Sequence, residues 1–385
     1  MSTLIKSTEA ADVLGVSKAT LYAYVSRGRL TRTTGSDGRT SLFARDEVER
    51  LAERSRRATP GPRPTIDVQI TSEVTAMSET MLRYRGFDVA ELVRDHGFED
   101  VAELLWSTAA SPHIPSNTTW PAARTDDISG CSLASAAPGA PLGRLAIAAH
   151  LLDGAHPNDE AADAARRLLT VIPSVLGSPR KTGPYALRLT QAWRRRPDPA
   201  LVDAIDTALG LLADHELATS TLAVRIAASV RTSPYAAIAA GLASVDGRLH
   251  GSASDEVHHF LMECAREEPA PVVTRYRREG RLIPGFGHKV YRGVDPRFGP
   301  LMDATAPLDP SGTKLDLVDH VIAEVGRVLP HRPNVDLALG ALTWTSGLDP
   351  DTPVFAIARI AGWAAHYTEE LAERPLRFRG VARTS

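Results

Sequence analysis

The sequence has few cysteines, little net charge and no long apolar segment. Its 385 residues include two cysteines, Cys131 and Cys264, which are too few for a disulfide scaffold or a multi-thiolate metal site. The formal net charge of -2 excludes attraction of nucleic acid by the chain as a whole. No run of about 20 apolar residues is present, and the opening MSTLIKSTEAADVLGV lacks the apolar stretch of a signal peptide. We therefore expect a reduced, cytoplasmic protein without a membrane partner.

Prolines mark a boundary close to the N-terminal end. In ERSRRATPGPRPTID, Pro60, Pro62 and Pro64 have fixed φ angles and no backbone N–H, which disfavours regular structure. We place a linker at 59–66, between a unit of residues 1–58 and a larger unit of residues 67–385. Residues 1–58 hold 11 Lys and Arg against 7 Asp and Glu, and the remainder holds 33 against 39. A small basic unit thus precedes a large acidic one.

Residues 1–58 carry the pattern of a helix-turn-helix. One helix is expected to end before Gly15, which permits a tight turn, and Ser17 is placed to cap a second helix. The pair Asp37-Gly38 suits a hairpin turn, and a charged helix is expected from Arg45. The unit resembles the winged helix-turn-helix of MerR-type regulators. That resemblance implies DNA contacts through Lys18, Tyr22, Arg27, Arg32 and Arg39. A module for packing, dimerisation or partner binding is the open alternative.

Beyond the linker, apolar residues recur with the 3.6-residue period of a helix. In KLDLVDHVIAEVGRVL, one face carries Leu317, Val318, Val321, Val325 and Leu329. The segments ALVDAIDTALGLLADHE and VFAIARIAGWAAHYTEEL show the same period, and alternating strand patterns are scarce. We expect a mainly α-helical unit, interrupted at 111–143 by an irregular connection rich in Pro, Ser and Gly.

Three motifs place a histidine beside small or charged residues. His215 lies in Asp214-His215-Glu216 at the end of an apolar helix, where a solvated helix end is the alternative. His250 lies in GRLHGSA, whose small residues leave room for a ligand, and a capping turn is the alternative. His288 lies in IPGFGHKVYR, where two glycines and several cations suit an anionic ligand.

Two charged residues adjoin apolar stretches near the C-terminus. Asp336 in PNVD is placed at a helix start, where an N-cap is the default interpretation. Arg359 lies inside FAIARIAGW, among residues that are expected to be buried. A buried cation needs a partner, either an internal carboxylate or a bound anion.

Six segments in series resemble segments of the citrate synthase family. They are LRYRGFDVAEL (82–92), ADHELATSTLAVR (213–225), GRLHGSAS (247–254), IPGFGHKVYRGVDPR (283–297), RPNVD (332–336) and FAIARIAGWAAHYTEE (355–370). The resemblance covers residues from about 66 to the C-terminus. It implies a mainly α-helical homodimer with a large domain of about 67–249 and 343–385 and a small domain of about 250–342. The active site would lie in the cleft between the two domains and be shared between subunits.

The same resemblance implies a role for each motif residue. His250 would polarise the thioester carbonyl, His288 would bind and protonate the oxaloacetate ketone, and Asp336 would remove the methyl proton. Oxaloacetate would be held by His215, His250, His288, Arg297, Arg359 and Arg374. The last of these would reach the partner subunit's site, with Arg377 as an alternative. CoA would lie along Ile283, Pro284, Gly285, Phe286, Gly287 and Lys289.

We therefore expect a citrate synthase, the acyltransferase that condenses acetyl-CoA with oxaloacetate in the tricarboxylic acid cycle, without a metal or other cofactor. Two alternatives stay open: a 2-methylcitrate synthase that uses propionyl-CoA, or a DNA-binding regulator that senses oxaloacetate or acyl-CoA. Three departures from the family's usual residues, Ala218, Ser252 and Ser254, alter the surroundings of His215 and His250. They leave the acyl group undecided, because one methylene is worth only about 1–3 kcal/mol in a pocket.

Overall fold

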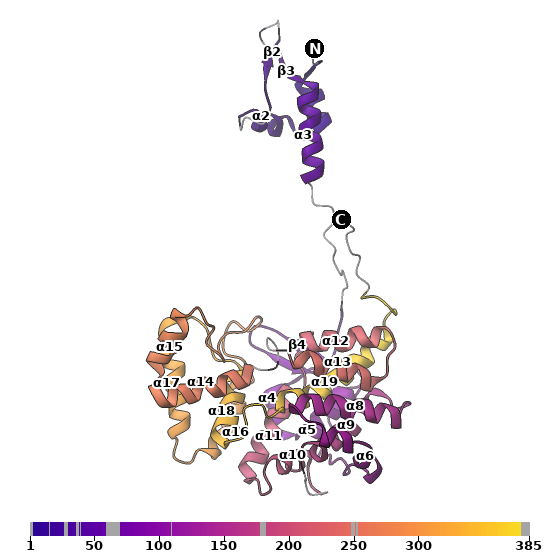
Figure 1. Ribbon diagram of the computed structural model, residues 1–385, viewed down its shortest axis with the longest axis vertical. Coiled ribbons are helices and arrows are strands. Elements are labelled where there is room, and N and C mark those ends of the chain that lie inside the picture. The colour runs from indigo at the N-terminus through magenta and orange to yellow at the C-terminus, as the bar shows by residue number, and fades with distance from the viewer. Residues whose placement is uncertain are drawn as a thin grey trace. The chain divides into compact units, whose positions relative to one another are not determined.

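The computed structural model describes residues 3–14, 16–26, 30–35, 38, 40–58, 70–108, 110–177, 182–247, 251 and 253–378. The chain divides into two compact units, one within Met1–Asp67 and the other within Val68–Phe378 (Figure 1). The predicted linker, residues 59–66, lies outside the described residues. The first unit has one hydrophobic core and the second has two, and none of the three is shared between the units.

The N-terminal unit combines three helices with a three-stranded antiparallel sheet. In chain order its elements are β1 (Leu4–Lys6), α1 (Ser7–Leu14), α2 (Lys18–Ser26), β2 (Thr33–Thr34), β3 (Ser41–Ala44) and α3 (Arg45–Ala58). Strand β3 is central, with Ile5 of β1 opposite Phe43 and Thr34 of β2 opposite Ser41. Ile5 and Phe43 of the sheet are buried together with Leu21 of α2, Ala10 of α1 and Val48 of α3, so all three helices contribute to the core.

The helix-turn-helix and its hairpin are confirmed by this unit. The backbone N–H of Thr20 donates to Ser17 Oγ at 3.2 Å, so Ser17 caps α2 as predicted. Strands β2 and β3 pair in a hairpin in which Gly38 has a φ of 65°, whereas Asp37 lies outside the described residues. Helix α3 begins at Arg45, whose guanidinium pairs with Glu9 of α1.

The second unit opens with a small antiparallel sheet and continues in helices. Its strands are β4 (Thr75–Met77), β5 (Leu82–Tyr84) and β6 (Phe87–Asp88), with β5 in the middle. The longer helices are α4 (Val89–Asp95), α5 (Phe98–Trp106), α8 (Pro141–Ala155), α9 (Ala161–Leu176), α10 (Tyr185–Trp193), α11 (Pro199–Leu212), α12 (Thr219–Ser229), α13 (Pro234–Val245), α14 (Ala253–Glu267), α15 (Pro269–Arg278), α16 (Phe298–Thr305), α17 (Thr313–Val328), α18 (Val335–Ser346) and α19 (Val354–Ala372). A short 3-10 helix, Ala306–Leu308, follows α16.

Two short helices lie in the segment that the sequence predicted to be irregular. They are α6 (Thr125–Gly130) and α7 (Ser132–Ala136), and α8 begins before the segment ends. The expectation for 111–143 is therefore wrong in part. Helices of five or six residues bury few side chains, here Asp127 and Ala134, and so leave no 3.6-residue apolar pattern for a sequence analysis to detect.

The helices of the second unit surround two hydrophobic cores. The larger core takes in most helices before α14 together with α19, and the smaller one lies among α14, α15, α17 and one face of α18 (Figure 1). The amphipathic face predicted for α17 is confirmed, because Val318, Val321 and Val325 are buried in the smaller core. Helix α18 supplies side chains to both cores, so it connects them.

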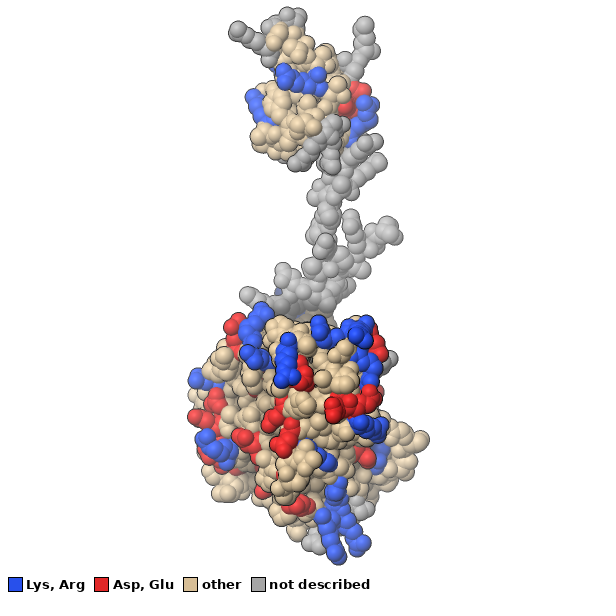
Figure 2. Space-filling model, turned by 90° about the vertical axis from the view of Figure 1, so that its left-hand side faces the viewer, with Lys and Arg blue, Asp and Glu red and all other residues tan. Residues whose placement is uncertain are grey.

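Side chains of both charge signs are interspersed on the face of the second unit that Figure 2 shows. In the described part of the chain, no helix is both long and apolar enough to span a bilayer.

Candidate active site

His215 is held in place by contacts to its two sequence neighbours. Asp214, which follows α11, is fully buried. The hydroxyl of Tyr84 donates to the Asp214 carbonyl oxygen at 2.8 Å. The Asp214 carboxylate accepts hydrogen bonds from the Thr75 hydroxyl at 2.5 Å and from the backbone N–H of Glu216 at 3.0 Å. The backbone on both sides of His215 is therefore fixed, which gives its ring a defined direction.

His288 lies in the loop between α15 and α16, and hydrogen bonds define its tautomer. Its Nδ1 accepts from the backbone N–H groups of Val290 at 3.0 Å and Tyr291 at 3.2 Å. Because Nδ1 is the acceptor, the proton of the neutral ring is on Nε2. His288 is therefore a hydrogen-bond donor through Nε2.

The two histidines and Tyr291 form a cluster of three rings in mutual contact. The histidine ring centres are 5.1 Å apart, Tyr291 stacks on His288 at 4.5 Å, and the Tyr291 hydroxyl lies 3.2 Å from His215 Nε2. Burial, aided by the positive charge of Arg297, lowers the pKa of His288 and holds that of His215 well below its usual value. Both rings are neutral near pH 7. Tyr291 is a site residue that the motif analysis missed, since an aromatic residue three places after a histidine gives no sign that the rings stack.

Arg297 is buried and held by a carboxylate from its own segment. Its Nε and Nη2 donate to the two oxygens of Asp295 at 3.0 and 2.7 Å. Asp295 also accepts from the backbone N–H of Val335 at 3.2 Å, which ties the start of α16 to the start of α18. Among the described residues, no acceptor takes the Nη1 donors of Arg297, so this nitrogen is available to a ligand.

Arg359 of α19 is a buried cation with unpaired donors. It is 2% exposed, and within the described ranges its Nε and Nη1 have no hydrogen-bond partner. Its guanidinium carbon lies 4.8 Å from the centre of the Phe355 ring. Burial lowers the pKa of Arg359, with Arg297 acting in the same direction and the Asp214 carboxylate opposing it. The sequence analysis allowed an internal carboxylate or a bound anion as the partner of this cation. No described carboxylate accepts from its Nε or Nη1, and the bound anion stays a prediction.

Asp336 lies in the first turn of α18 with its carboxylate uncommitted. Asn334 is the N-cap, since its Oδ1 accepts from the backbone N–H groups of Asp336 at 3.0 Å and Leu337 at 3.3 Å. The default interpretation of Asp336 as an N-cap is therefore wrong. No described residue donates a hydrogen bond to its carboxylate. Burial raises the pKa of Asp336, opposed in part by Arg297 and Arg359, so this carboxylate shares one electrostatic environment with both arginines.

The His288 loop and the start of α18 are joined by backbone hydrogen bonds. Gly287 N donates to the Arg332 carbonyl at 2.8 Å, Asn334 N donates to the Gly285 carbonyl at 3.0 Å, and Asn334 Nδ2 donates to the Gly287 carbonyl at 2.9 Å. Gly285 has a φ of 82°, and an added Cβ would lie 2.8 Å from Leu337 Cβ. The glycine is therefore required both by its backbone conformation and by the close approach of α18.

The remaining predicted site residues either lie outside the described residues or have roles that stay predictions. His250 and Ser252 lie outside the described residues. In the predicted CoA loop, Ile283 is buried in the smaller core and Lys289 is exposed, and the role of this loop stays a prediction. Arg374 is exposed beyond the end of α19, and its contact with a partner subunit likewise stays a prediction.

Comparison with known proteins identifies the family. Residues 67–379 match the family model described as "Citrate synthase, C-terminal domain". The chain belongs to the citrate synthase family. Residues 4–56 match a second model, described as "Helix-turn-helix domain".

Relatives of this citrate synthase family member cover most of its length. A 2-methylcitrate synthase of Mycobacterium tuberculosis is 29% identical in an alignment of 338 positions that covers 79% of this chain and 84% of the relative. Citrate synthase 2 of Bacillus subtilis is 28% identical in an alignment of 336 positions that covers 79% of this chain and 90% of the relative. One of these relatives is named as a 2-methylcitrate synthase and the other as a citrate synthase, so their names do not decide the acyl group.

Solved citrate synthases share the fold. The ternary complex of the Thermoplasma acidophilum enzyme with carboxymethyl coenzyme A and oxaloacetate has a TM-score of 0.68 and 22% identity, and covers 83% of this chain and 94% of the other. The Pyrobaculum aerophilum enzyme has a TM-score of 0.67 and 22% identity, and covers 80% and 88%. The mainly α-helical, citrate synthase-like fold predicted from the sequence is therefore confirmed.

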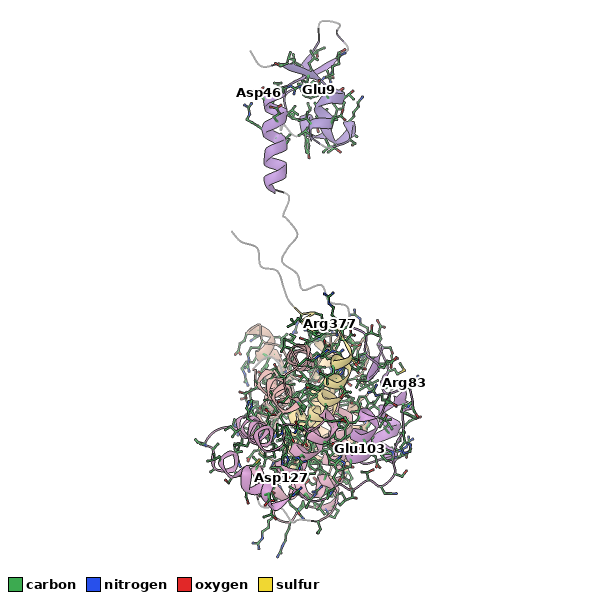
Figure 3. The ribbon with its side chains drawn as sticks, turned by 90° about the vertical axis from the view of Figure 1, so that its right-hand side faces the viewer. Glu9, Asp46, Arg83, Glu103, Asp127 and Arg377 are labelled. Atoms are coloured by element: carbon green, nitrogen blue, oxygen red, sulfur yellow. The ribbon has the colours of Figure 1, made fainter. Side chains whose placement is uncertain are left out.

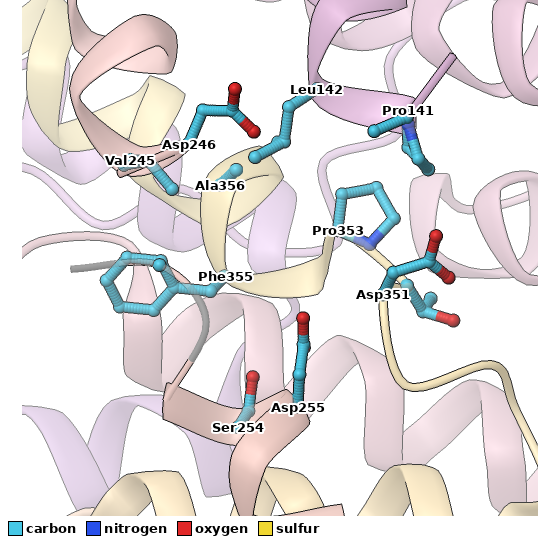
Figure 4. Close-up of a pocket in the computed structure, with 13 residues that line it drawn as sticks. Pro141, Leu142, Val245, Asp246, Ser254, Asp255, Asp351, Pro353, Phe355 and Ala356 are labelled. Atoms are coloured by element: carbon cyan, nitrogen blue, oxygen red, sulfur yellow. The ribbon is translucent and has the colours of Figure 1, made fainter. Parts of the chain in front are cut away.

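A hollow of about 140 Å³ is lined by Gly251, Ser254 and Asp246, among other residues (Figure 4). Phe355, over which the Arg359 guanidinium lies, is one of its lining residues. Asp255 of α14 and Asp351 face the same hollow, and burial together with the Asp351 charge raises the pKa of Asp255 to about 6. The hollow therefore connects the start of α14 with the segment that leads into the Arg359 helix.

A buried network of charges lies behind Asp214. His366 Nε2 is 3.2 Å from Asp214 Oδ2, and Arg225 Nη1 donates to His366 Nδ1 at 3.1 Å. Arg225 Nε in turn donates to Glu370 at 3.0 Å. Arg377 closes the series, donating to Glu370 from Nε at 2.7 Å and from Nη2 at 2.6 Å at the end of α19 (Figure 3). Arg377, the alternative for the subunit-bridging arginine, is thus committed to an internal carboxylate.

Three of the five predicted DNA-contacting side chains are described, and all are exposed: Lys18, Tyr22 and Arg32. Arg27 and Arg39 lie outside the described residues. The exposed Tyr22 ring packs edge-on against Phe43 at 6.5 Å, and a hydrogen bond with Ser41 is the main cause of its lowered pKa.

Proposed function

We propose that the chain is a citrate synthase, which condenses acetyl-CoA with oxaloacetate to give citrate and CoA. The observation that carries the proposal is the Arg359 guanidinium, which is buried and unpaired beside two neutral histidines and the buried, partly committed Arg297. A small dianion such as oxaloacetate would balance these charges. A solved relative of the same fold was obtained with oxaloacetate and a CoA derivative.

Oxaloacetate would be oriented by its two carboxylates. Arg359 offers Nε and Nη1, and Arg297 offers Nη1, since Asp295 occupies its other nitrogens. Arginine donors in such pairs fix direction as well as charge. His215 would contribute a further hydrogen bond, in a direction that Asp214 and Tyr291 set.

Proton removal from the thioester would fall to Asp336. Its carboxylate receives no hydrogen bond from the described residues, and burial raises its pKa, so it is a stronger base than an exposed aspartate. A thioester α-proton is too weakly acidic for a carboxylate alone, so a donor on the carbonyl oxygen is needed to stabilise the enol. We assign that donor to His250.

Carbon–carbon bond formation would use His288. The enol carbon attacks the ketone carbon of oxaloacetate, and the developing alkoxide takes the proton of His288 Nε2, the nitrogen that the backbone contacts to Nδ1 leave protonated. Water then cleaves the thioester of the citryl-CoA, releasing citrate and the CoA thiol. Side-chain acid–base chemistry accounts for every step, so we propose no cofactor.

The alternative acyl group is propionyl. It would make the protein a 2-methylcitrate synthase, and a relative with that name is 29% identical. Ala218, one of the departures from the family pattern, is the N-cap residue of α12 and lies three residues after His215, and it provides no side-chain cap. The loss of a polar side chain there favours neither substrate by itself.

Release of free CoA thiol tests the proposal. We expect turnover of acetyl-CoA or propionyl-CoA with oxaloacetate, and the faster thioester names the enzyme. Asp336→Asn should abolish turnover, whereas Asp319→Asn, an exposed aspartate of α17, should not. Oxaloacetate binding without turnover of either thioester by the wild type would instead support the metabolite-sensing regulator.

We also propose a homodimer. Four exposed apolar side chains lie where the end of α12 meets the end of α19: Ile226, Val230, Leu371 and Leu376. The backbone N–H of Leu376 donates to the Ser229 carbonyl at 3.1 Å, which brings these two ends together. A second copy would cover this patch and place Arg374 near its partner's site. Sedimentation of the wild type and of Ile226→Glu with Val230→Glu would test the assembly.

DNA binding is a second function for the N-terminal unit. The helix-turn-helix family match and the exposed Lys18, Tyr22 and Arg32 on it favour this role. A dimer would present two such units, as half-site recognition requires. We expect salt-dependent shifts of genomic fragments that Lys18→Ala with Arg32→Ala weakens. Shifts that these substitutions leave unchanged would count against recognition by this unit.

A further inference from the structure

The buried network behind Asp214 contains a histidine, His366 of α19, that no step of the proposed reaction uses. Its ring is fully buried, and it lies seven residues after Arg359 on the same helix. We propose that His366 is a positioning residue, which orients the Asp214 carboxylate and so keeps Arg359 available for oxaloacetate. Through Asp214 it also steadies the backbone beside His215. The inference rests on the proposed function and adds to it a residue that does not itself touch the substrate.

The contacts of His366 determine which ring nitrogen carries its proton. Arg225 Nη1 lies 3.1 Å from His366 Nδ1, and a guanidinium can only donate, so Nδ1 is the acceptor. The proton of the neutral ring is then on Nε2, which lies 3.2 Å from Asp214 Oδ2 and donates to it. The guanidinium is itself held by two carboxylates of α19, Glu370 at 3.0 Å and Glu369 at 2.9 Å. Arg225 therefore orients the His366 donor toward Asp214.

The hydrogen bonds to the Asp214 carboxylate converge on one of its two oxygens. In the described part of the chain, Oδ2 accepts from the Thr75 hydroxyl, the Glu216 N–H and the His366 ring, whereas Oδ1 has no hydrogen-bond partner. Oδ1 instead faces α19 at Gly362, where an added Cβ would lie 2.3 Å from it. Of the three donors, His366 is the one that α19 supplies.

Arg359, Gly362 and His366 lie on one face of α19. Their spacings of three and four residues are those of neighbours on a helix surface. At Gly362 the helix backbone comes close to the chain before His215, and the Gly362 N–H donates to the Ala213 carbonyl at 3.0 Å. The same face therefore carries the proposed anion-binding cation, a close backbone contact and the donor to Asp214.

Asp214 and Arg359 interact electrostatically but are not paired. Burial lowers the pKa of Arg359 and Asp214 is the main charge that opposes it, yet among the described residues no hydrogen bond joins the two side chains. An ion pair between them would occupy the donors that oxaloacetate needs. Without the His366 donor, we expect the carboxylate to turn toward the guanidinium and compete with the substrate. That turn would also disturb the hydrogen bond to the Glu216 N–H, and with it the direction of the His215 ring.

Oxaloacetate binding and steady-state kinetics of the full chain test this role. His366→Leu should weaken oxaloacetate binding and raise its KM about tenfold or more, because a donor to a buried charge is lost, and should leave the KM of the thioester unchanged. His366→Gln should restore most of the affinity, because a side-chain amide can accept from Arg225 and donate to Asp214.

The matched control is His156→Leu, which takes a histidine away from a different buried carboxylate. His156 Nε2 lies 2.6 Å from Asp127 Oδ1, and Arg167 donates to the same carboxylate at 3.2 Å. That group thus repeats the combination of arginine, histidine and aspartate at a place outside the proposed site. The control variant should lose stability and keep both KM values.

Nitrogen-15 spectra of the histidine rings give a readout that depends neither on turnover nor on oxaloacetate. In the wild type we expect His366 to be protonated on Nε2 alone. His366→Leu should shift the ring signals of His215, which His215→Gln assigns, whereas His156→Leu should leave them in place.

The outcomes separate this role from a merely structural one and from failure of the proposed function. Unchanged oxaloacetate affinity in His366→Leu, an equal loss in the leucine and glutamine variants, or His215 signals that do not move would each overturn it. If the leucine variant does not fold, a wild-type His366 that carries its proton on Nδ1 would overturn it. A wild type that does not bind oxaloacetate would refute the proposed function, and the His215 signals would still decide whether His366 acts through Asp214.

Discussion

Replacement of Arg359 by methionine separates ligand binding from folding stability. Methionine keeps most of the side-chain length but removes a charge that is 2% exposed and has two unpaired nitrogens. A hydrogen bond to a charged group contributes about 1.5–3 kcal/mol, so the loss of two would cost about 3–6 kcal/mol of oxaloacetate binding. At about 1.4 kcal/mol for each factor of ten, the affinity should fall by about 10²–10⁴.

The same substitution should not destabilise the protein without its ligand. A buried cation with unpaired donors costs free energy, which Asp214 offsets only in part. We expect the free energy of unfolding without ligand to stay equal or to rise by about 1–3 kcal/mol. Oxaloacetate at 100 times its wild-type dissociation constant should stabilise the wild type by about 2.7 kcal/mol and the Arg359→Met variant by at most about 0.4 kcal/mol.

Denaturant unfolding with and without oxaloacetate measures both effects. The control is Arg188→Met, because Arg188 is similarly buried but donates to the carbonyl oxygens of Trp120 and Pro121, both at 3.2 Å. That variant should lose stability and keep the oxaloacetate effect. The reasoning is refuted if Arg359→Met is as destabilised as Arg188→Met while oxaloacetate still protects it.

Three further substitutions or conditions test neighbouring parts of the site. Ala218→Asn should raise the free energy of unfolding by about 1 kcal/mol in thermal or urea unfolding, because α12 starts without a side-chain cap. Gly362→Ala should destabilise by about 1–3 kcal/mol and weaken oxaloacetate binding in calorimetry, because its Cβ would lie 2.3 Å from Asp214 Oδ1. In a pH profile, turnover needs ionised Asp336, whose pKa is raised from 3.8, so activity should fall with decreasing pH at a point above that value. Asp336→Glu should move this limb, and a limb left in place would assign it to another group.

The motifs predicted which residues matter but not how they are held. The order of segments indicated the family, and the helical period indicated the faces of α17 and the end of α11. The tautomer of His288, by contrast, depends on two backbone N–H groups further along its own loop, and no side-chain pattern encodes them. Tyr291 was missed for a related reason, because its stacking on His288 is a matter of loop conformation.

The N-cap of α18 shows a second limit of prediction from the sequence. Asn334 and Asp336 are both common N-cap residues, and the sequence alone does not decide which of them begins the helix. The structure assigns the cap to Asn334, whose Oδ1 bonds both following N–H groups. That difference of two residues changes the interpretation of Asp336 from a structural carboxylate to an uncommitted one. The chemistry of the site therefore rests on a helix boundary, which is the feature that sequence patterns define least well.

The hydrogen bonds around α18 determine which parts of the site move together. Asn334 joins this helix to the His288 loop, and Asp295 joins it to Arg297. Helix α18 also packs into the larger core, to which the helix of Arg359 belongs. His288, Asp336 and the two arginines are thus linked to one framework through α18. Because α18 also packs into the smaller core with α14, α15 and α17, any displacement of those three helices would reach the proposed oxaloacetate site through the same framework.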